Sequence, residues 1–466
     1  MQQRQPQSPL PAFLSGSAYI GKKDPTTARK YFAQALAKNP AYFPAAAALA
    51  QLDMKDGQIK AAQGRFDQIL AADPRNAEAM QAEALLALRS GQESKYLEWL
   101  NKATQADSKA FQPRALIAQY YLSKRDFAKA LAAALGASDA QPGNPAAQEL
   151  LGTTQLAAGE ANNAVATFSK LIELKPSSAP LRFQQARALI AAKQNDAAQA
   201  SLEKAISLNP GFVEAQFTLA TLHARAGRYD DALRIARQIQ RGHPENAAGL
   251  LLEGDIQMAA KQPAQALAAY DKASTRQASG PIIIKQQLAL VALGRASDGE
   301  GRLSAWLKQH PEDMGVRAEY AQVLLGGGQY QPAVEQYRYL AARIPNNLAL
   351  LNNLAYALAQ LKDPQAVGFA EQALKLAPDN PSALDTMGWT LAQTGHPDKA
   401  IVHLQKALSK KPDDGDIQFH YAATLAMNGD KPRAQQELEQ LLSTGISFSL
   451  EKEARALLKT LQASAS

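Results

Sequence analysis

Histidines are the first residues of this sequence whose type could do chemistry, because an imidazole binds metals and transfers protons near neutral pH. None of them stands four residues from another, the spacing that places two metal ligands on one helix face. The six are His223, His243, His310, His396, His403 and His420. His243 and His310 each precede a proline, where a cationic residue suits a helix end. We therefore predict helix-end positions for these two and no metal site.

Two other chemical signals are equally weak. The sequence contains no cysteine, which excludes disulfides, thiolate nucleophiles and cysteine metal ligands. Gly326, Gly327 and Gly328 form a glycine-rich stretch, but the lysine and the strand of a phosphate loop are missing beside it. A turn between helices is the better interpretation. We predict a protein that is not an enzyme, with no catalytic residue, no cofactor and no metal.

A proline that recurs at a fixed interval marks the ends of the predicted repeat units. Pro40 and Pro74 stand 34 residues apart, and most of the later prolines of the series follow at 34 residues or twice that interval. The series is Pro40, Pro74, Pro142, Pro176, Pro210, Pro244, Pro311, Pro345, Pro378 and Pro412. The intervals from Pro244 to Pro311 and from Pro345 to Pro378 are each one residue short, as a deletion in a turn would make them. Such a period indicates a repeat architecture.

Within each unit, small and large apolar residues alternate at helical spacing. Ala or Gly recurs at one position, as at Ala50, Gly152 and Gly388, and a second small series follows twelve residues later, as at Ala62 and Ala400. Larger residues stand four beyond the second series. Small holes and large knobs are what two packed helices need. Turns rich in Gly or Asn separate the two helices, at Gly57, Gly91, Gly159, Asn195, Gly227, Gly328, Gly395 and Gly429.

This pattern resembles the tetratricopeptide repeat (TPR), over nearly the whole chain. The resemblance implies an all-α fold, a right-handed superhelix of helix-turn-helix repeats. We expect a polar N-terminus and a degenerate first repeat in residues 1–42, about twelve repeats in residues 43–448, and a capping helix and tail in residues 449–466. The predicted unit starts are Phe43, Ala77, Phe111, Pro145, Ala179, Val213, Ala247, about Gly280, Met314, Leu348, Pro381 and Gly415. Ser449 is predicted to cap the last helix, over residues 450–462.

Charge and hydropathy exclude two kinds of partner. The net charge is +7, but the basic residues are scattered, and no stripe of them with interleaved aromatic rings could follow a nucleic-acid backbone. The longest apolar stretch, residues 41–50, contains Pro44 and is far shorter than the roughly 20 residues that span a bilayer. We predict neither a nucleic-acid partner nor a transmembrane segment.

A partner-binding wall is implied by the resemblance. In TPR arrays the second, fifth, ninth and twelfth positions of a unit line a concave groove, and here the C-terminal units place Asn352, Tyr356, Asp385, Trp389 and Phe419 there. Amides, carboxylates and rigid rings on one wall suit an extended peptide. The alternative is that Tyr356 and Trp389 fill the space between successive first helices. Asp385 replaces the cation that would grip a terminal carboxylate, which argues against a chaperone-tail adaptor.

A narrower resemblance covers residues 346–461, which are similar to the closing repeats of the TPR lipoproteins (PrsT-type) of PEP-CTERM and exosortase systems. That family implies an accessory role in the bacterial envelope, with a lipid anchor on a cysteine. The present sequence has no cysteine and starts with polar residues from Met1 to Pro6, without the apolar run of an export signal. As written it predicts a cytoplasmic chain. The first repeat begins part-way through the repeat pattern, at Pro9. We therefore expect more repeats, or an export signal, upstream in a longer parent protein.

Three functional hypotheses follow. The first is a non-catalytic scaffold that binds protein or peptide partners in the concave groove, accessory to exopolysaccharide export or to PEP-CTERM protein sorting. The second is the substrate-recruiting array of a larger enzyme, such as a glycosyltransferase. The third is a cytosolic regulator. The parent reading frame separates them, because a lipoprotein signal favours the first and a catalytic domain favours the second.

Overall fold

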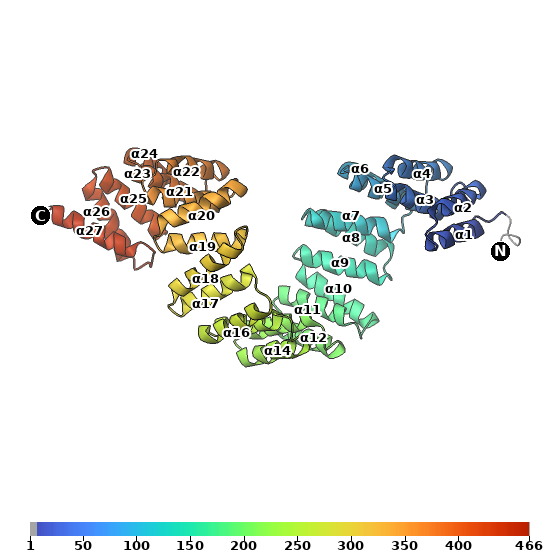
Figure 1. Cartoon of the computed structure of the whole chain (residues 1–466), viewed down its shortest axis with the longest axis horizontal. Coiled ribbons are helices and arrows are strands. Elements are labelled where there is room, and N and C mark those ends of the chain that lie inside the picture. The colour runs from blue at the N-terminus through green and yellow to red at the C-terminus, as the bar shows by residue number, and fades with distance from the viewer. Residues whose placement is uncertain (1–6, 466) are drawn as a thin grey trace. The chain divides into compact units, whose positions relative to one another are not determined.

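The structure is a computed structural model that describes residues 7–465, and these residues form 27 α-helices and no strand (Figure 1). Two compact units, residues 1–222 and 223–466, divide the chain. In chain order the helices are α1 (Leu10–Gly21), α2 (Pro25–Lys38), α3 (Phe43–Lys55), α4 (Ile59–Ala72), α5 (Ala77–Arg89), α6 (Glu93–Ala106), α7 (Phe111–Ser123), α8 (Phe127–Ala140), α9 (Pro145–Ala157), α10 (Ala161–Leu174), α11 (Ala179–Ala191), α12 (Asn195–Leu208), α13 (Val213–Arg225), α14 (Tyr229–Gly242), α15 (Ala248–Ala259), α16 (Pro263–Arg276), α17 (Gly280–Ala292), α18 (Ala296–Gln309), α19 (Met314–Gly326), α20 (Tyr330–Arg343), α21 (Leu348–Gln360), α22 (Gln365–Leu376), α23 (Pro381–Gln393), α24 (Pro397–Lys410), α25 (Gly415–Met427), α26 (Lys431–Ser443) and α27 (Glu451–Ala465).

The helices pair into hairpins, each with an odd-numbered first helix and an even-numbered second helix. Within each unit a hairpin packs on the hairpins before and after it (Figure 1). The predicted all-helical repeat fold is confirmed. The observed first helices begin at the predicted residues, for instance α3 at Phe43 and α23 at Pro381, while α15 begins one residue after the predicted Ala247.

Polar side chains start many of the first helices. Asn76 precedes α5, and its side-chain oxygen accepts a hydrogen bond from the backbone N–H of Ala79 at 2.9 Å. Such a cap satisfies one of the N–H groups that a helix start leaves without a partner. The same role is played by Asn144, Ser178, Asp313, Asn347, Asn380 and Asp414. The sequence thus fixes where each hairpin begins.

The turn inside each hairpin needs one residue in the left-handed region. Glycine supplies it in most units, as at Gly159 with φ +83°. The predicted turn position Asn195 is wrong, because Asn195 is the first residue of α12 and Lys193 takes the left-handed conformation with φ +60°. Lysine or arginine does the same in four other turns, at Lys23, Arg125, Lys261 and Lys362.

The same core contact recurs along the array: an aromatic side chain of the second helix packs against a small residue of the first helix. Phe168 on α10 is fully buried, and a Cβ added to Gly152 on α9 would lie only 2.9 Å from its Cζ. The aromatic residue stands sixteen positions after the small one, and Phe32 faces Gly16 in the same way. The predicted contact between small and large residues is therefore confirmed, and it sets how closely the two helices of a hairpin approach.

The two proline intervals that are one residue short, from Pro244 to Pro311 and from Pro345 to Pro378, have separate structural origins. Only three residues connect Arg276 at the end of α16 to Gly280 at the start of α17, whereas four residues connect α18 to α19. The second short interval comes from α22, which has 12 residues where α24 has 14, while the turn before α22 is one residue longer than the turn before α24. The first deletion thus falls in a connection between helices, as predicted, whereas the second shortens the start of a helix.

The last helix, α27, packs on the final hairpin with Ala454 and Leu461 buried. It begins one residue later and ends three residues later than predicted. The predicted Ser449 cap is wrong: the Ser449 hydroxyl donates to Asp416 Oδ2 at 2.7 Å, and the Leu450 N–H donates to Asp416 Oδ1 at 3.1 Å. The carboxylate of α25 therefore holds the start of α27. Of the predicted polar N-terminus, residues 1–6 lie outside the described residues, and so does residue 466.

Candidate functional site

The five predicted groove residues come from three successive first helices of the second unit. Asn352 and Tyr356 stand on α21, Asp385 and Trp389 on α23, and Phe419 on α25. Because α21 packs on α23 and α23 packs on α25, the structure places the five on one wall of neighbouring helices. Tyr356, Trp389 and Phe419 belong to the same hydrophobic cluster.

His420 joins this wall and was missed by the sequence reasoning. Its Nδ1 lies 2.9 Å from Oδ1 and 3.1 Å from Oδ2 of Asp385. A carboxylate only accepts hydrogen bonds, so we assign the proton to Nδ1, which leaves Nε2 as the second ring nitrogen. The available signal was the repeat itself: Asp385 is the fifth residue of its unit and His420 the sixth of the next, on adjacent first helices.

Trp389 packs between neighbouring rings. Its indole stacks on the imidazole of His420 with the centroids 4.3 Å apart and the planes 19° apart, and the Phe419 ring lies 6.3 Å away. Trp389 and Phe419 are each 7% exposed, and His420 is 3% exposed. Stacked and tilted aromatic pairs at these distances add stability beyond their buried area. Both rings that were predicted to offer contact area to a partner therefore also pack within the array.

Tyr356 occupies the α21 side of the wall, 6.4 Å from the His420 ring. The pKa of Tyr356 is raised to about 12, chiefly by burial, with smaller contributions in the same direction from the Tyr330 hydroxyl and the carboxylates of Asp385 and Asp416, against a hydrogen bond with Gln360 that lowers it. The phenol is consequently neutral at physiological pH. It can donate a hydrogen bond to a ligand and carries no charge.

Several polar atoms of the wall are buried without a partner among the described residues. These are Asn352 Oδ1, Trp389 Nε1, Thr390 Oγ1 and His420 Nε2. The neighbouring Asn353, by contrast, donates from Nδ2 to the Tyr337 hydroxyl at 3.1 Å. Unpaired buried groups cost free energy and are uncommon in folded chains.

Metal and membrane sites can be addressed from the same coordinates. Residues 7–465 hold no group of three or more His, Asp or Glu side chains placed to share a metal ion. None of the helices described is long and apolar enough to cross a bilayer. His243 and His310 end α14 and α18 as predicted, and Gly328 stands in the turn between α19 and α20 with φ +71°.

Comparison with known proteins addresses the family. Two tetratricopeptide repeat profiles match the chain, one over residues 19–88, 189–252 and 391–445 and the other over residues 116–179 and 285–347. Together they cover most of the hairpins described above. The chain is a tetratricopeptide repeat protein.

Two curated relatives of this TPR protein come from Pseudomonas. TPR repeat-containing protein PA4667 of Pseudomonas aeruginosa is 30% identical over 171 residues, which are 35% of this chain and 28% of that protein. Cellulose synthase operon protein C of Pseudomonas fluorescens (strain SBW25) is 26% identical over 453 residues, 82% of this chain and 35% of that protein. The chain thus spans about a third of the length of these relatives.

Solved structures of similar arrays are more distant. The APC/C hetero-tetramer Cut9-Hcn1 covers 98% of both chains at 15% identity with a TM-score of 0.39. MamA from Desulfovibrio magneticus RS-1 covers 36% of this chain and 96% of its own at 15% identity, with a TM-score of 0.33. Likeness at this level carries no functional argument for this TPR protein.

Proposed function

We propose that this TPR protein is a non-catalytic scaffold that binds a segment of a partner protein during the export of a bacterial exopolysaccharide. The observation that carries the proposal is the similarity to cellulose synthase operon protein C over 453 residues, which takes in 82% of this chain. TPR arrays bind protein partners through their helix faces. The similarity reaches only 35% of that relative, so its other parts are no guide to this chain.

The wall of α21, α23 and α25 is the surface that we assign to the partner. Asp385 is the charged group of its polar cluster, with a side chain 14% exposed, and Asp416 stands on the next first helix. An acidic wall repels a terminal carboxylate and attracts a basic or polar segment. The neutral Tyr356 hydroxyl, which can donate a hydrogen bond, would pair with a backbone carbonyl of an extended peptide. These features support an internal, extended segment as the ligand.

A narrower role is part of the same proposal. The resemblance of residues 346–461 to the TPR lipoproteins of PEP-CTERM and exosortase systems favours an envelope location and an accessory role in protein sorting. This part rests on the resemblance alone. It predicts that processing of PEP-CTERM proteins changes together with polymer export when the chain is removed.

Deleting the coding region in the host and measuring the polymer tests the scaffold. We expect secreted exopolysaccharide to fall while the cell-associated polymer is retained, with full recovery on complementation. Complementation with Asp385→Arg should fail at matched levels of folded protein, because the wall then repels a basic segment; thermal melting of the purified variant checks that loss of the contact with His420 leaves it folded. Asp398→Arg, an equal charge change at an exposed residue of α24, should complement. Unchanged secretion in the deletion strain would refute the export role.

A further inference from the structure

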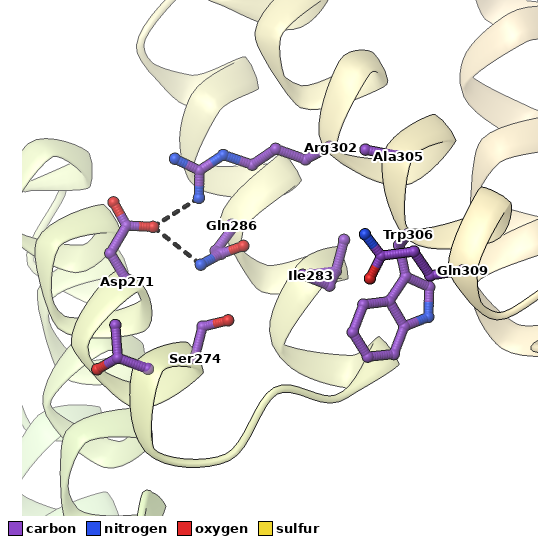
Figure 2. A pocket seen from close by; sticks show the side chains of 9 residues that line it. Asp271, Ser274, Ile283, Gln286, Arg302, Ala305, Trp306 and Gln309 are labelled. Carbon is purple, nitrogen blue, oxygen red and sulfur yellow. Dashed lines mark hydrogen bonds and ion pairs between the residues drawn. The ribbon is translucent and has the colours of Figure 1, made fainter.

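A second site lies among the second helices, away from the groove residues. A cleft of about 490 Å³ is bounded by α16, α17 and α18. It lies beside the shortened connection between α16 and α17. Figure 2 shows Asp271 and Arg302 facing each other at one end and Trp306 at the other, next to Ile283. Clefts of this volume hold small ligands when a few polar groups fix the orientation.

The polar end of the cleft is a built hydrogen-bond network. Asp271 Oδ1 accepts from Arg302 Nη1 at 2.5 Å and from Gln286 Nε2 at 2.8 Å. Gln286 is 3% exposed, and in Figure 2 its amide oxygen points away from Asp271. The side chains of Arg302 and Asp271 are 35% and 44% exposed, so both still reach solvent. The ion pair has no net charge, and it offers hydrogen-bond donors and acceptors side by side.

The other end of the cleft is a fixed aromatic wall. The Trp306 Nε1–H donates to Asp313 Oδ2 at 2.9 Å, and the His310 ring packs against the indole with the centroids 3.9 Å apart. Asp313 in turn caps α19, since its Oδ1 accepts from the Val316 N–H at 3.0 Å. These contacts hold the ring in place with its N–H already used. What Trp306 offers to the cleft is therefore the surface of its ring, beside the buried Ile283.

A comparison inside the chain separates the chemistry of this cleft from its size. The repeat-equivalent cleft between α2 and α4 is larger, about 640 Å³. There Ala33 stands in the place of Asp271 and Ile69 in the place of Trp306, while Arg65 matches Arg302. The repeat architecture thus accounts for the cleft itself. Relative to the cleft between α2 and α4, the cleft at α16, α17 and α18 carries two additional groups, the Asp271 carboxylate and the Trp306 indole. The equivalent unit forms its cleft without either residue.

We infer that the α16–α18 cleft binds a neutral hexopyranose unit of a polysaccharide. A sugar ring presents vicinal hydroxyls that donate and accept at once, which matches the adjacent Asp271 carboxylate and Arg302 guanidinium. Its C–H face is weakly positive and packs on the negative face of an indole. The neutral ion pair gives no advantage to a charged sugar. This site goes beyond the proposed scaffold role and is independent of the groove of α21, α23 and α25.

Calorimetric titration of the purified full chain with neutral hexasaccharides tests the inference. The probes are cellohexaose, maltohexaose and mannohexaose, with an anionic oligoguluronate hexamer as the contrast. We expect at least one neutral probe to bind and to change tryptophan fluorescence. Trp306→Ile and Asp271→Ala, the residues of the equivalent cleft, should each weaken binding about tenfold or more. Trp99→Ile on α6 should leave binding unchanged.

Three outcomes would overturn the saccharide site. They are no heat or fluorescence change with any neutral probe at about 10 mM, tighter binding of the oligoguluronate, or full affinity in both cleft variants. Thermal melting of each variant checks its folding, and Arg302→Gln provides a further cleft variant if Trp306→Ile unfolds. If the cleft variants abolish a protein complex while no sugar binds, the cleft is a protein contact and the inference is wrong. Because these titrations contain no partner protein, failure of the groove hypothesis does not affect them.

Discussion

A Cβ added to Gly388 would lie 2.6 Å from Cγ of Leu404 and 3.1 Å from the backbone oxygen of Ala400. Gly388 stands on α23 and the other two on α24, so this contact sets the distance between the helices of the hairpin. Real Cβ atoms do not approach other carbons so closely. Even a methyl group must therefore push the two helices apart or move Leu404, which is fully buried.

Substitution of Gly388 should destabilise the second unit. Helix propensity alone favours a mild or stabilising effect for Gly388→Ala, because alanine is the better helix former. The contact with Leu404 reverses that expectation, and we predict a loss of about 1 to 3 kcal/mol for alanine and more for leucine. Urea unfolding measures it. Gly368→Ala, at an exposed α22 position with no atom near the added Cβ, should instead stabilise. Equal effects at both positions would contradict the packing assignment.

The turn residue with left-handed backbone gives a second prediction, in which no side-chain packing contributes to the change in stability. Gly159 has φ +83° and nothing within 4 Å of an added Cβ, so Gly159→Ala should cost about 1 kcal/mol through backbone strain alone. Lys193 holds the same position one unit later with φ +60°, and Lys193→Gly should be neutral or slightly stabilising. Melting curves of the two variants decide it. A loss at Lys193→Gly as large as that at Gly159→Ala would refute the strain argument.

A buried carboxyl group makes the first unit sensitive to pH. Glu83 on α5 is 2% exposed, and its pKa is raised from 4.5 to about 7, chiefly by burial and also by the charge of Asp67, against a hydrogen bond with Gln63 that lowers it. The folded chain then keeps a proton that the unfolded chain loses, so stability falls as the pH rises from 4.5 to 7 and stays lower above that. This loss amounts to about 1 to 3 kcal/mol of the free energy of unfolding. We expect Glu83→Gln to flatten the corresponding pH dependence in urea unfolding. Glu78→Gln, exposed on the same helix, should keep the wild-type profile.

Local opening should begin at α18. Gly299 and Gly301 lie inside this helix, where each glycine lowers helix stability by about 1 kcal/mol relative to alanine. Gly294 does not add to the weakness, because it stands in the turn with φ +74°, where glycine is favourable. Since stability in an array is a sum of unit and neighbour contributions, α18 should exchange its amide protons before α20. Hydrogen exchange with mass spectrometry measures this, and equal protection of the two helices would contradict it.

The fold was predictable from the sequence because the same pattern of packing residues recurs in every repeat. Each unit repeats the small residue, the knob and the polar helix start, so an error in one unit is corrected by its neighbours. What failed were single positions. Asn195 was taken for the turn residue because lysine in the left-handed region is uncommon, and Ser449 was taken for a cap although the Asp416 carboxylate is the stronger acceptor.

The candidate site was less predictable, because burial is a property of several helices together. Position within the unit assigned Asp385 and Trp389 to one first helix, α23, which packs between α21 and α25. It could not show that Trp389 is 7% exposed, since the covering side chains, among them His420 and Phe419, come from the next unit. The cleft at Trp306 was also missed, because its walls come from neighbouring units and its aromatic side chain stands where the equivalent cleft between α2 and α4 has Ile69.

The last prediction concerns Trp389, whose two possible roles have different signatures. Its burial against His420 predicts that Trp389→Ala costs about 3 to 5 kcal/mol of stability, as for other large core rings. Trp389→Phe keeps a ring on the imidazole and removes only the larger indole and its unpaired N–H. We expect this variant to melt within a few degrees of the wild type. If the exposed edge of the indole contacts a partner, Trp389→Phe should still restore less exopolysaccharide secretion per folded molecule in the deletion strain. Full restoration by Trp389→Phe would leave Trp389 as repeat packing and confine the binding hypothesis to Asp385 and Tyr356.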